Sequence, residues 1–219
     1  MKKLFIFPIL FLGQILFSQT QKEYIYYNGY DDYLNNNPMQ PTVITYVKEF
    51  TPNAILIDTF KYKDSDKTAK KERLSWALKD GNDLYLSMYN ASYIYQNKTF
   101  AKFNIIGKKY MVILLDEKTD RKAIGHDNPY GGGLLGAALN MKPKSSWKDK
   151  HGNTFKILYI DIENPYRSKG SGQKNVIALL LDTQKIIELN ENSSEIIQKL
   201  KNNEYYVEDF IEFVNNANK

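Results

Sequence analysis

The chain has 219 residues, of which 42% are hydrophobic and 25% charged, and it contains no cysteine. The missing cysteine excludes disulfides, thiolate metal sites, cysteine nucleophiles and lipid attachment through a cysteine. Aromatic residues are frequent, with 17 tyrosines, and favour β-sheet. The net charge is +5, and without Lys2 and Lys3 it is +3, because 28 basic residues then face 25 acidic ones. Such a small charge does not indicate a nucleic-acid partner.

The first 18 residues have the composition of a secretory signal peptide. Lys2 and Lys3 form a basic start, Leu4–Phe17 is almost wholly apolar, and Ser18 is a small residue at which a signal peptidase could cut. The apolar run is shorter than the about 20 residues of a membrane-spanning helix, so an uncleaved anchor is the less favoured alternative. We therefore expect residues 1–18 to be removed on export. The mature protein is then periplasmic, on the outer-membrane surface or secreted.

Runs of apolar, β-branched and aromatic residues predict a series of strands. The expected strands span 24–27, 42–50, 54–62, 84–89, 99–106, 109–115, 155–162, 175–181 and 185–189. Asp80-Gly81 lies between two runs and predicts a hairpin, because glycine accepts the positive φ of a tight reversal. The runs between Trp76 and Leu115 are expected to form a four-strand antiparallel meander. Between Gly29 and Pro38, one or two helical turns are expected.

The end of the chain predicts helices. Asn192 and Glu195 fit a capping box before an apolar helix. The last helix shows apolar residues at i, i+3, i+4 and i+7, which form one face expected to cover the sheet: Val207, Phe210, Ile211 and Val214. The fold class is therefore α+β, a mostly antiparallel β-sheet with C-terminal helices packed on it. We expect a single domain over 19–219, with a flexible glycine-rich excursion around 118–152.

The tyrosines allow two interpretations. Their flat apolar rings and polar hydroxyls suit a platform for sugars or peptides. Alternation along strands instead sends many of them into the core, and we expect core and sheet packing for most members of the group: Tyr24, Tyr26, Tyr27, Tyr30, Tyr33, Tyr85, Tyr89, Tyr93 and Tyr95.

The order of these features resembles that of uncharacterised secreted proteins of Bacteroidetes bacteria. The features are the signal peptide, Gly29-Tyr30-Asp31-Asp32-Tyr33-Leu34 ending at Asn37-Pro38, Asp80-Gly81 leading into Leu84-Tyr85-Leu86, a Gly107 turn before Tyr110, a glycine-rich apolar piece and a helical tail. The resemblance implies an exported bacterial protein of undefined activity, and it supplies no catalytic residues.

The glycine-rich segment contributes most of the candidate binding residues: Tyr130, Gly131, Gly132, Gly133 and Gly136. Gly132 and Gly136 have the GxxxG spacing, which in an apolar helix allows a second helix to approach closely. Weak membrane association through Leu134–Leu139 is one possibility, and a packed or mobile surface loop is the favoured alternative. The segment does not match a phosphate-binding GxxxxGK loop.

His126 and Asp127 complete the candidate binding residues. Histidine beside carboxylates supplies metal ligands or acid–base groups, and Asp116 and Glu117 lie nearby in the sequence. No HExxH spacing and no GxSxG elbow is present, so solvent-exposed residues are the default interpretation.

The sequence favours a non-enzymatic binding or interaction module of the bacterial envelope, with an unknown envelope ligand or protein as its partner. We expect no catalytic residue, no metal and no cofactor. The alternative is an envelope hydrolase that uses carboxylates or the pair His126 and Asp127. A second alternative is a peripheral outer-membrane protein held by Leu134–Leu139.

Overall fold

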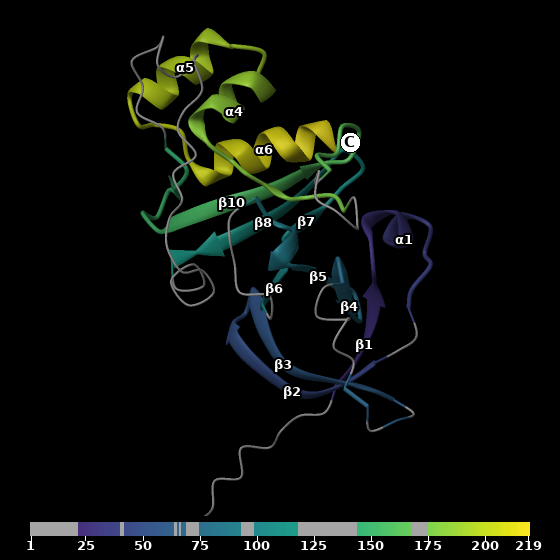
Figure 1. Ribbon diagram of the computed structural model, residues 1–219. Helices are drawn as coiled ribbons and strands as arrows, with labels where there is room; N and C mark the ends of the chain where they lie inside the picture. Colours follow the sequence, from purple (N-terminus) through teal and green to yellow (C-terminus); the bar gives the residue numbers. More distant parts are fainter. Residues whose placement is uncertain are drawn as a thin grey trace, which may run out of the picture.

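The computed structural model describes residues 22–39, 42–63, 65, 67–68, 75–92, 99–117, 144–167 and 175–219, without the side chains of 42–50 and 58. The expected signal peptide, residues 1–18, lies outside these ranges. Within them, an antiparallel barrel lies next to a second antiparallel sheet, and helices cover the far side of that sheet (Figure 1). The predicted α+β fold class is confirmed.

Six strands form the closed barrel in the order β1-β2-β3-β6-β5-β4. They are β1 (Lys22–Tyr27), β2 (Thr42–Thr51), β3 (Ala54–Tyr62), β4 (Ala77–Asp80), β5 (Asp83–Ser87) and β6 (Thr99–Lys102). The predicted hairpin of β2 and β3 is confirmed, with register shifts along β2 that mark bulges. Bulges bend a strand, and such bending helps a sheet to close.

The Asp80-Gly81 hairpin is confirmed, and ion pairs tie it to both neighbouring strands. Asp80 pairs with Asp83 in the ladder, and Gly81 adopts a φ of +58°. Lys22 on β1 lies 2.8 Å from the Asp80 carboxylate, and Lys102 on β6 lies 2.7 Å from that of Asp83. The hairpin is thus fixed between β1 and β6.

The second sheet has the order β11-β10-β8-β7, with β9 also paired to β10. Its strands are β7 (Ile105–Ile106), β8 (Tyr110–Asp116), β9 (Trp147–Lys148), β10 (Thr154–Asp161) and β11 (Leu179–Leu180). β8 and β10 pair along their whole length, from Phe155 opposite Asp116 to Asp161 opposite Tyr110. The expected strand 175–181 is regular only at β11.

The predicted meander is confirmed for β4, β5 and β6 and is wrong for its fourth strand, because the chain changes sheets after β6. β6 pairs with β5 and β3 inside the barrel, whereas β7 pairs with β8 in the second sheet. The backbone makes the change over two residues. The Phe103 N–H donates to the Leu84 carbonyl in the barrel (2.9 Å), and the Asn104 N–H donates to the Val112 carbonyl in the second sheet (2.8 Å).

The helices of the described residues are α1 (Tyr30–Leu34), the 3-10 turn η2 (Met88–Asn90), α4 (Thr183–Leu189), α5 (Ser194–Lys201) and α6 (Val207–Ala217). The predicted strand 185–189 is wrong, because these residues belong to α4. Its N-cap is Asp182, whose carboxylate accepts a hydrogen bond from the Lys185 N–H at 2.8 Å. Such a cap stabilises the first helical turn and here outweighs the β-branched Ile186 and Ile187. The helix predicted after Asn192 is present, although Ser193 is its N-cap.

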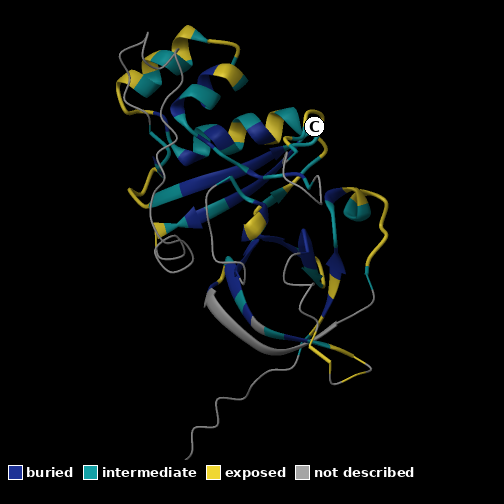
Figure 2. Ribbon diagram, in the orientation of Figure 1, coloured by how far each residue is buried: buried dark blue, intermediate teal, exposed yellow. Residues whose placement is uncertain are grey.

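Buried side chains form one cluster inside the barrel, one between the barrel and the second sheet, and one between that sheet and the helices. Figure 2 shows dark blue along β8, β10 and the side of α6 that faces them. The predicted apolar face of α6 is confirmed, because Val207, Phe210 and Val214 are buried against this sheet. The core interpretation is confirmed for the buried tyrosines: Tyr24, Tyr26, Tyr27, Tyr30 and Tyr85.

Asn218 fixes the end of α6 to the second sheet. Its side-chain oxygen accepts hydrogen bonds from the Lys109 N–H (2.9 Å) and the Tyr110 N–H (2.8 Å), and its amide nitrogen donates to the Tyr110 carbonyl (3.2 Å). The side-chain amide therefore pairs with the start of β8 as a neighbouring strand would. Gly107 allows this approach, since a Cβ there would overlap the Asn218 amide.

Candidate functional site

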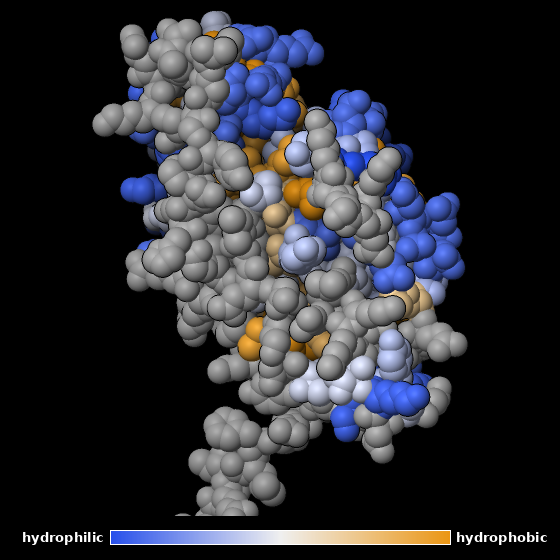
Figure 3. All heavy atoms as spheres, viewed as in Figure 1, coloured by the Kyte–Doolittle hydropathy of each residue, from blue (hydrophilic) through white to orange (hydrophobic). Residues whose placement is uncertain are grey.

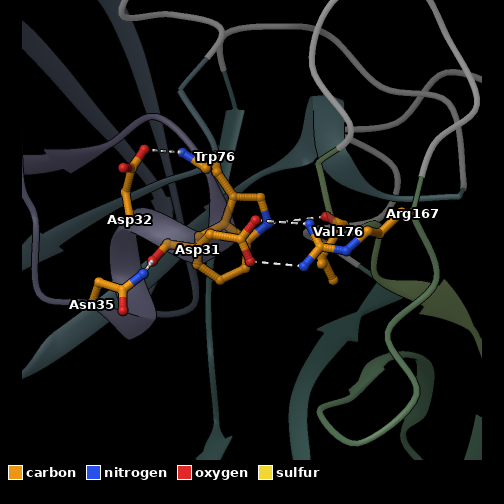
Figure 4. Close-up of polar contacts among 7 residues, drawn as sticks. Asp31, Asp32, Asn35, Trp76, Arg167 and Val176 are labelled. Carbon is orange, nitrogen blue, oxygen red and sulfur yellow. Dashed lines mark hydrogen bonds and ion pairs between the residues drawn. The ribbon is translucent and has the colours of Figure 1, made fainter.

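The candidate site is the junction at which the barrel meets the second sheet. We define the junction as α1, Trp76, residues 88–92, residues 166–167 and residues 175–178. The short helix α1 is formed by the Gly29-to-Leu34 motif. At its start, the Asp32 carboxylate accepts a hydrogen bond from the Gly29 N–H at 3.1 Å. Figure 4 shows α1 facing Arg167 and Trp76 facing Val176.

Trp76 is the centre of the junction. Its side chain is fully buried, and its indole Nε1–H donates to the Val176 carbonyl at 2.9 Å. Its ring lies 5.2 Å from that of Tyr30 and 5.6 Å from that of Tyr33, both on α1, measured between centroids. One indole therefore connects the barrel, α1 and the chain beyond β10.

Three extended segments lie side by side across the junction. The Ala178 N–H donates to the Asn90 carbonyl (2.9 Å), and the Ile177 N–H donates to the Tyr166 carbonyl (2.8 Å). Isolated bridges pair Ala91 with Ala178 and Arg167 with Val176. Val176 and Ala178 are buried in the cluster between the barrel and the second sheet, whereas Tyr166 is largely exposed.

Asp31 and Arg167 form a bidentate ion pair at the edge of this ladder. The Arg167 Nη1–Asp31 Oδ2 distance is 3.0 Å and the Nη2–Oδ1 distance is 2.7 Å. The hydrogen bonds from Arg167 hold the pKa of the Asp31 carboxyl below its ordinary value, and the carboxylate raises the pKa of Arg167. Both side chains remain open to solvent, at 37% for Arg167 and 65% for Asp31, so the pair orients the segment more than it stabilises the fold.

This ion pair predicts a small loss of stability in acid. A carboxyl whose pKa is lower in the folded protein contributes stability that is complete well above its ordinary pKa of 3.8 and is lost as the pH falls through the lowered value. We expect the stability difference between the wild type and Asp31→Asn to shrink between about pH 5 and about pH 2. Urea unfolding at several pH values measures it. A stability difference that does not change across that range would contradict the assignment of this ion pair. So would a pH dependence of stability for Arg167→Gln that differs from that of Asp31→Asn.

The junction also carries the most exposed large hydrophobic side chains of the described residues. Tyr89 is 60% exposed, Leu34 55% and Tyr166 51%, compared with 46% for Ile106, the next in order. Leu34 lies three residues after Asp31 on α1, and Tyr166 immediately precedes Arg167. On the face that Figure 3 shows, hydrophilic residues dominate over α1 and the helices, and the hydrophobic areas between them are small.

The polar groups of the junction are suited to holding the chain in place. Asp31, Asp32 and the Trp76 indole all have intramolecular partners. The Tyr30 hydroxyl is buried and has no hydrogen-bond partner among the described residues, and burial raises the pKa of Tyr30, so it stays protonated at neutral pH. Among the described residues there is no group of three His, Cys, Asp or Glu side chains placed to hold a metal ion. No helix in the described ranges is long and apolar enough to cross a membrane.

The residues singled out from the sequence lie elsewhere in the chain. His126, Asp127, Tyr130, Gly131–Gly133, Gly136 and the segment Leu134–Leu139 all fall outside the described residues. Asp116 ends β8, with Glu117 directly after it. The junction residues Trp76 and Val176 carry no motif of their own. The Gly29-to-Leu34 motif, from which only one or two helical turns were expected, builds α1.

Comparisons with known proteins give one match. No curated protein and no solved structure matches the chain. The model of a family of unknown function, DUF6563, matches residues 25–205, which include the barrel from β1 onward, the junction, the second sheet and helices α4 and α5. The chain therefore belongs to the DUF6563 family.

Proposed function

We propose that this protein is an exported, non-enzymatic interaction module of the bacterial envelope, and that it contacts its partner through the junction. The export part rests on the basic start and apolar run of residues 1–18. The interaction part rests on the surface of the junction.

One observation carries the proposal: the three most exposed large hydrophobic side chains of the described residues, Leu34, Tyr89 and Tyr166, all belong to the junction. Tyrosine and arginine are enriched among the residues that dominate binding energy at protein interfaces, and Arg167 lies next to Tyr166. Backbone hydrogen bonds and the Trp76 indole hold the segments that carry them. A surface held in this way loses little conformational entropy on binding.

Site-specific photo-cross-linking in the producing cells tests the contact surface. A photo-reactive residue at Tyr166 is expected to give a discrete cross-linked product. The same residue at Ile106, on β7 and 46% exposed, is the matched control and is expected to give none. The double substitution Leu34→Ser with Tyr89→Ser should remove the product formed from position 166, because it takes away the other two exposed apolar side chains of the junction.

Equal products from positions 166 and 106 would mean non-specific contact, and a product that survives the double substitution would place the interface elsewhere. Either result would overturn the assignment of the junction.

A further inference from the structure

Tyr166 and Arg167 are held by two kinds of contact. Through the backbone, the Ile177 N–H donates to the Tyr166 carbonyl at 2.8 Å, and an isolated bridge pairs Arg167 with Val176. Through the side chain, the Arg167 guanidinium donates two hydrogen bonds to the Asp31 carboxylate, at 2.7 Å and 3.0 Å. The backbone contacts link Tyr166 to the segment that leads into β11, and the ion pair links it to α1, which follows β1 of the barrel.

The segment opposite Tyr166 is anchored independently of this ion pair. The Val176 carbonyl accepts the hydrogen bond of the Trp76 indole, and the Ala178 N–H donates to the Asn90 carbonyl at 2.9 Å. Val176 and Ala178 are also fully buried. Loss of the ion pair therefore leaves this segment in place, and the part of the ladder that it loosens is the exposed one, at Tyr166.

The geometry of the ion pair is suited to positioning. Two parallel hydrogen bonds between a guanidinium and a carboxylate fix the orientation of both groups, which a single contact does not. An exposed ion pair adds little to the free energy of global unfolding. The same small energy matters more for local opening, because exposed edges of a structure open at a much lower free energy than the core.

We propose that Asp31 and Arg167 are positioning residues of the contact surface, and that their ion pair keeps Tyr166 fixed relative to α1. This inference rests on the proposed function of the junction. Because Leu34 lies on α1 with Asp31, the pair joins the elements that carry two of the three exposed hydrophobic side chains. A side chain that is already held does not have to be ordered on binding, which is worth about threefold to tenfold in affinity.

Amide hydrogen exchange of the full-length protein tests the positioning without any partner. In Asp31→Asn, the Ile177 N–H is expected to exchange about two- to fivefold faster, because its acceptor is the Tyr166 carbonyl. The Ala178 N–H, which donates to Asn90, is the internal control and should keep its rate. Glu23→Gln is the matched control variant, because it breaks another exposed ion pair, with Lys63 at 2.8 Å on the barrel, and it should change neither rate.

A double-mutant cycle shows whether the two residues act as one unit. Arg167→Gln should have the same effect as Asp31→Asn, and the double variant should be no worse than either single variant. Arg167→Lys keeps the charge but loses the fork of two hydrogen bonds, so it should restore only part of the protection of the Ile177 N–H. Additive effects of the two single substitutions would contradict a shared ion pair.

Cross-linking in the producing cells tests the role in binding. With the photo-reactive residue at position 166, Asp31→Asn should lower the yield of the discrete product about threefold to tenfold, and Glu23→Gln should leave it unchanged. The urea midpoint at neutral pH should be similar for both variants, which separates positioning from a general loss of stability.

The two measurements fail in different ways. An unchanged exchange rate of the Ile177 N–H in Asp31→Asn would overturn the positioning role whatever the partner does. Faster exchange with an unchanged yield would overturn its role in binding and leave the proposed function intact. No product from the wild type would overturn the proposed function itself, and the role in binding with it.

Discussion

Replacing Trp76 by alanine is expected to destabilise the protein by about 3–5 kcal/mol, the usual cost of truncating a buried tryptophan. The indole is fully buried and touches the rings of Tyr30 and Tyr33. Its loss leaves a cavity and also leaves the Val176 carbonyl without its donor. Because a domain's total stability is about 5–15 kcal/mol, this change removes a large share of it.

Urea unfolding of the variant measures this effect, with Tyr89→Ala as the control. Tyr89 belongs to the same junction but is 60% exposed, so its replacement should change the stability by no more than about 0.5 kcal/mol. Trp76→Phe keeps most of the ring but loses the hydrogen bond, and should cost about 1–3 kcal/mol. If Trp76→Ala cost no more than Tyr89→Ala, the junction would not be held by this indole.

Replacing Phe210 by alanine is the second change with a large expected effect, again about 3–5 kcal/mol. Phe210 is 1% exposed on the inner face of α6, and its ring lies 6.2 Å from that of Tyr159 on β10 and 6.1 Å from that of Phe213. The truncation removes aromatic contacts between the helix and the sheet at the centre of that cluster. Thermal or urea unfolding provides the measurement.

Glu212→Ala is the control for Phe210→Ala, because Glu212 lies two residues away on the exposed side of the same helix. It should change the stability by no more than about 0.5 kcal/mol. A Phe210→Ala cost below about 1 kcal/mol would mean that α6 contributes little to the core, against the packing described above.

Local features of the fold could be predicted because the physics that determines them is local. The spacing of Val207, Phe210 and Val214 specifies one helical face whatever lies opposite it, and the structure buries that face. Gly81 specifies a tight reversal because few other residues adopt a positive φ at low cost. The strands β2, β3, β8 and β10 were predicted from composition for the same reason.

The features that could not be predicted depend on contacts between distant parts of the chain. Whether β7 continues the barrel or starts a second sheet is decided by pairing partners, and the apolar pattern is the same in both cases. The segment 185–189 has the composition of a strand, and the cap at Asp182 together with burial of Ile186 and Ile187 decides for a helix.

The candidate site illustrates the same limit of local patterns. Trp76 and Val176 are separated by 100 positions, and Asp31 and Arg167 by 136. The sequence drew attention instead to Gly131–Gly136 and His126, where unusual residues lie together. Neither a lone tryptophan in a strand pattern nor a lone arginine in a loop signals that the two will meet at one junction.

Fractionation of expressing cells, with the N-terminus of the protein read from each fraction, tests the proposed role most directly. Because Lys2, Lys3 and the run Leu4–Phe17 fit a cleaved signal peptide, we predict a mature protein that begins near Gln19 in the soluble envelope fraction or the medium. Recovery of a chain with an intact Met1 in the cytosol would contradict the proposal of an exported interaction module.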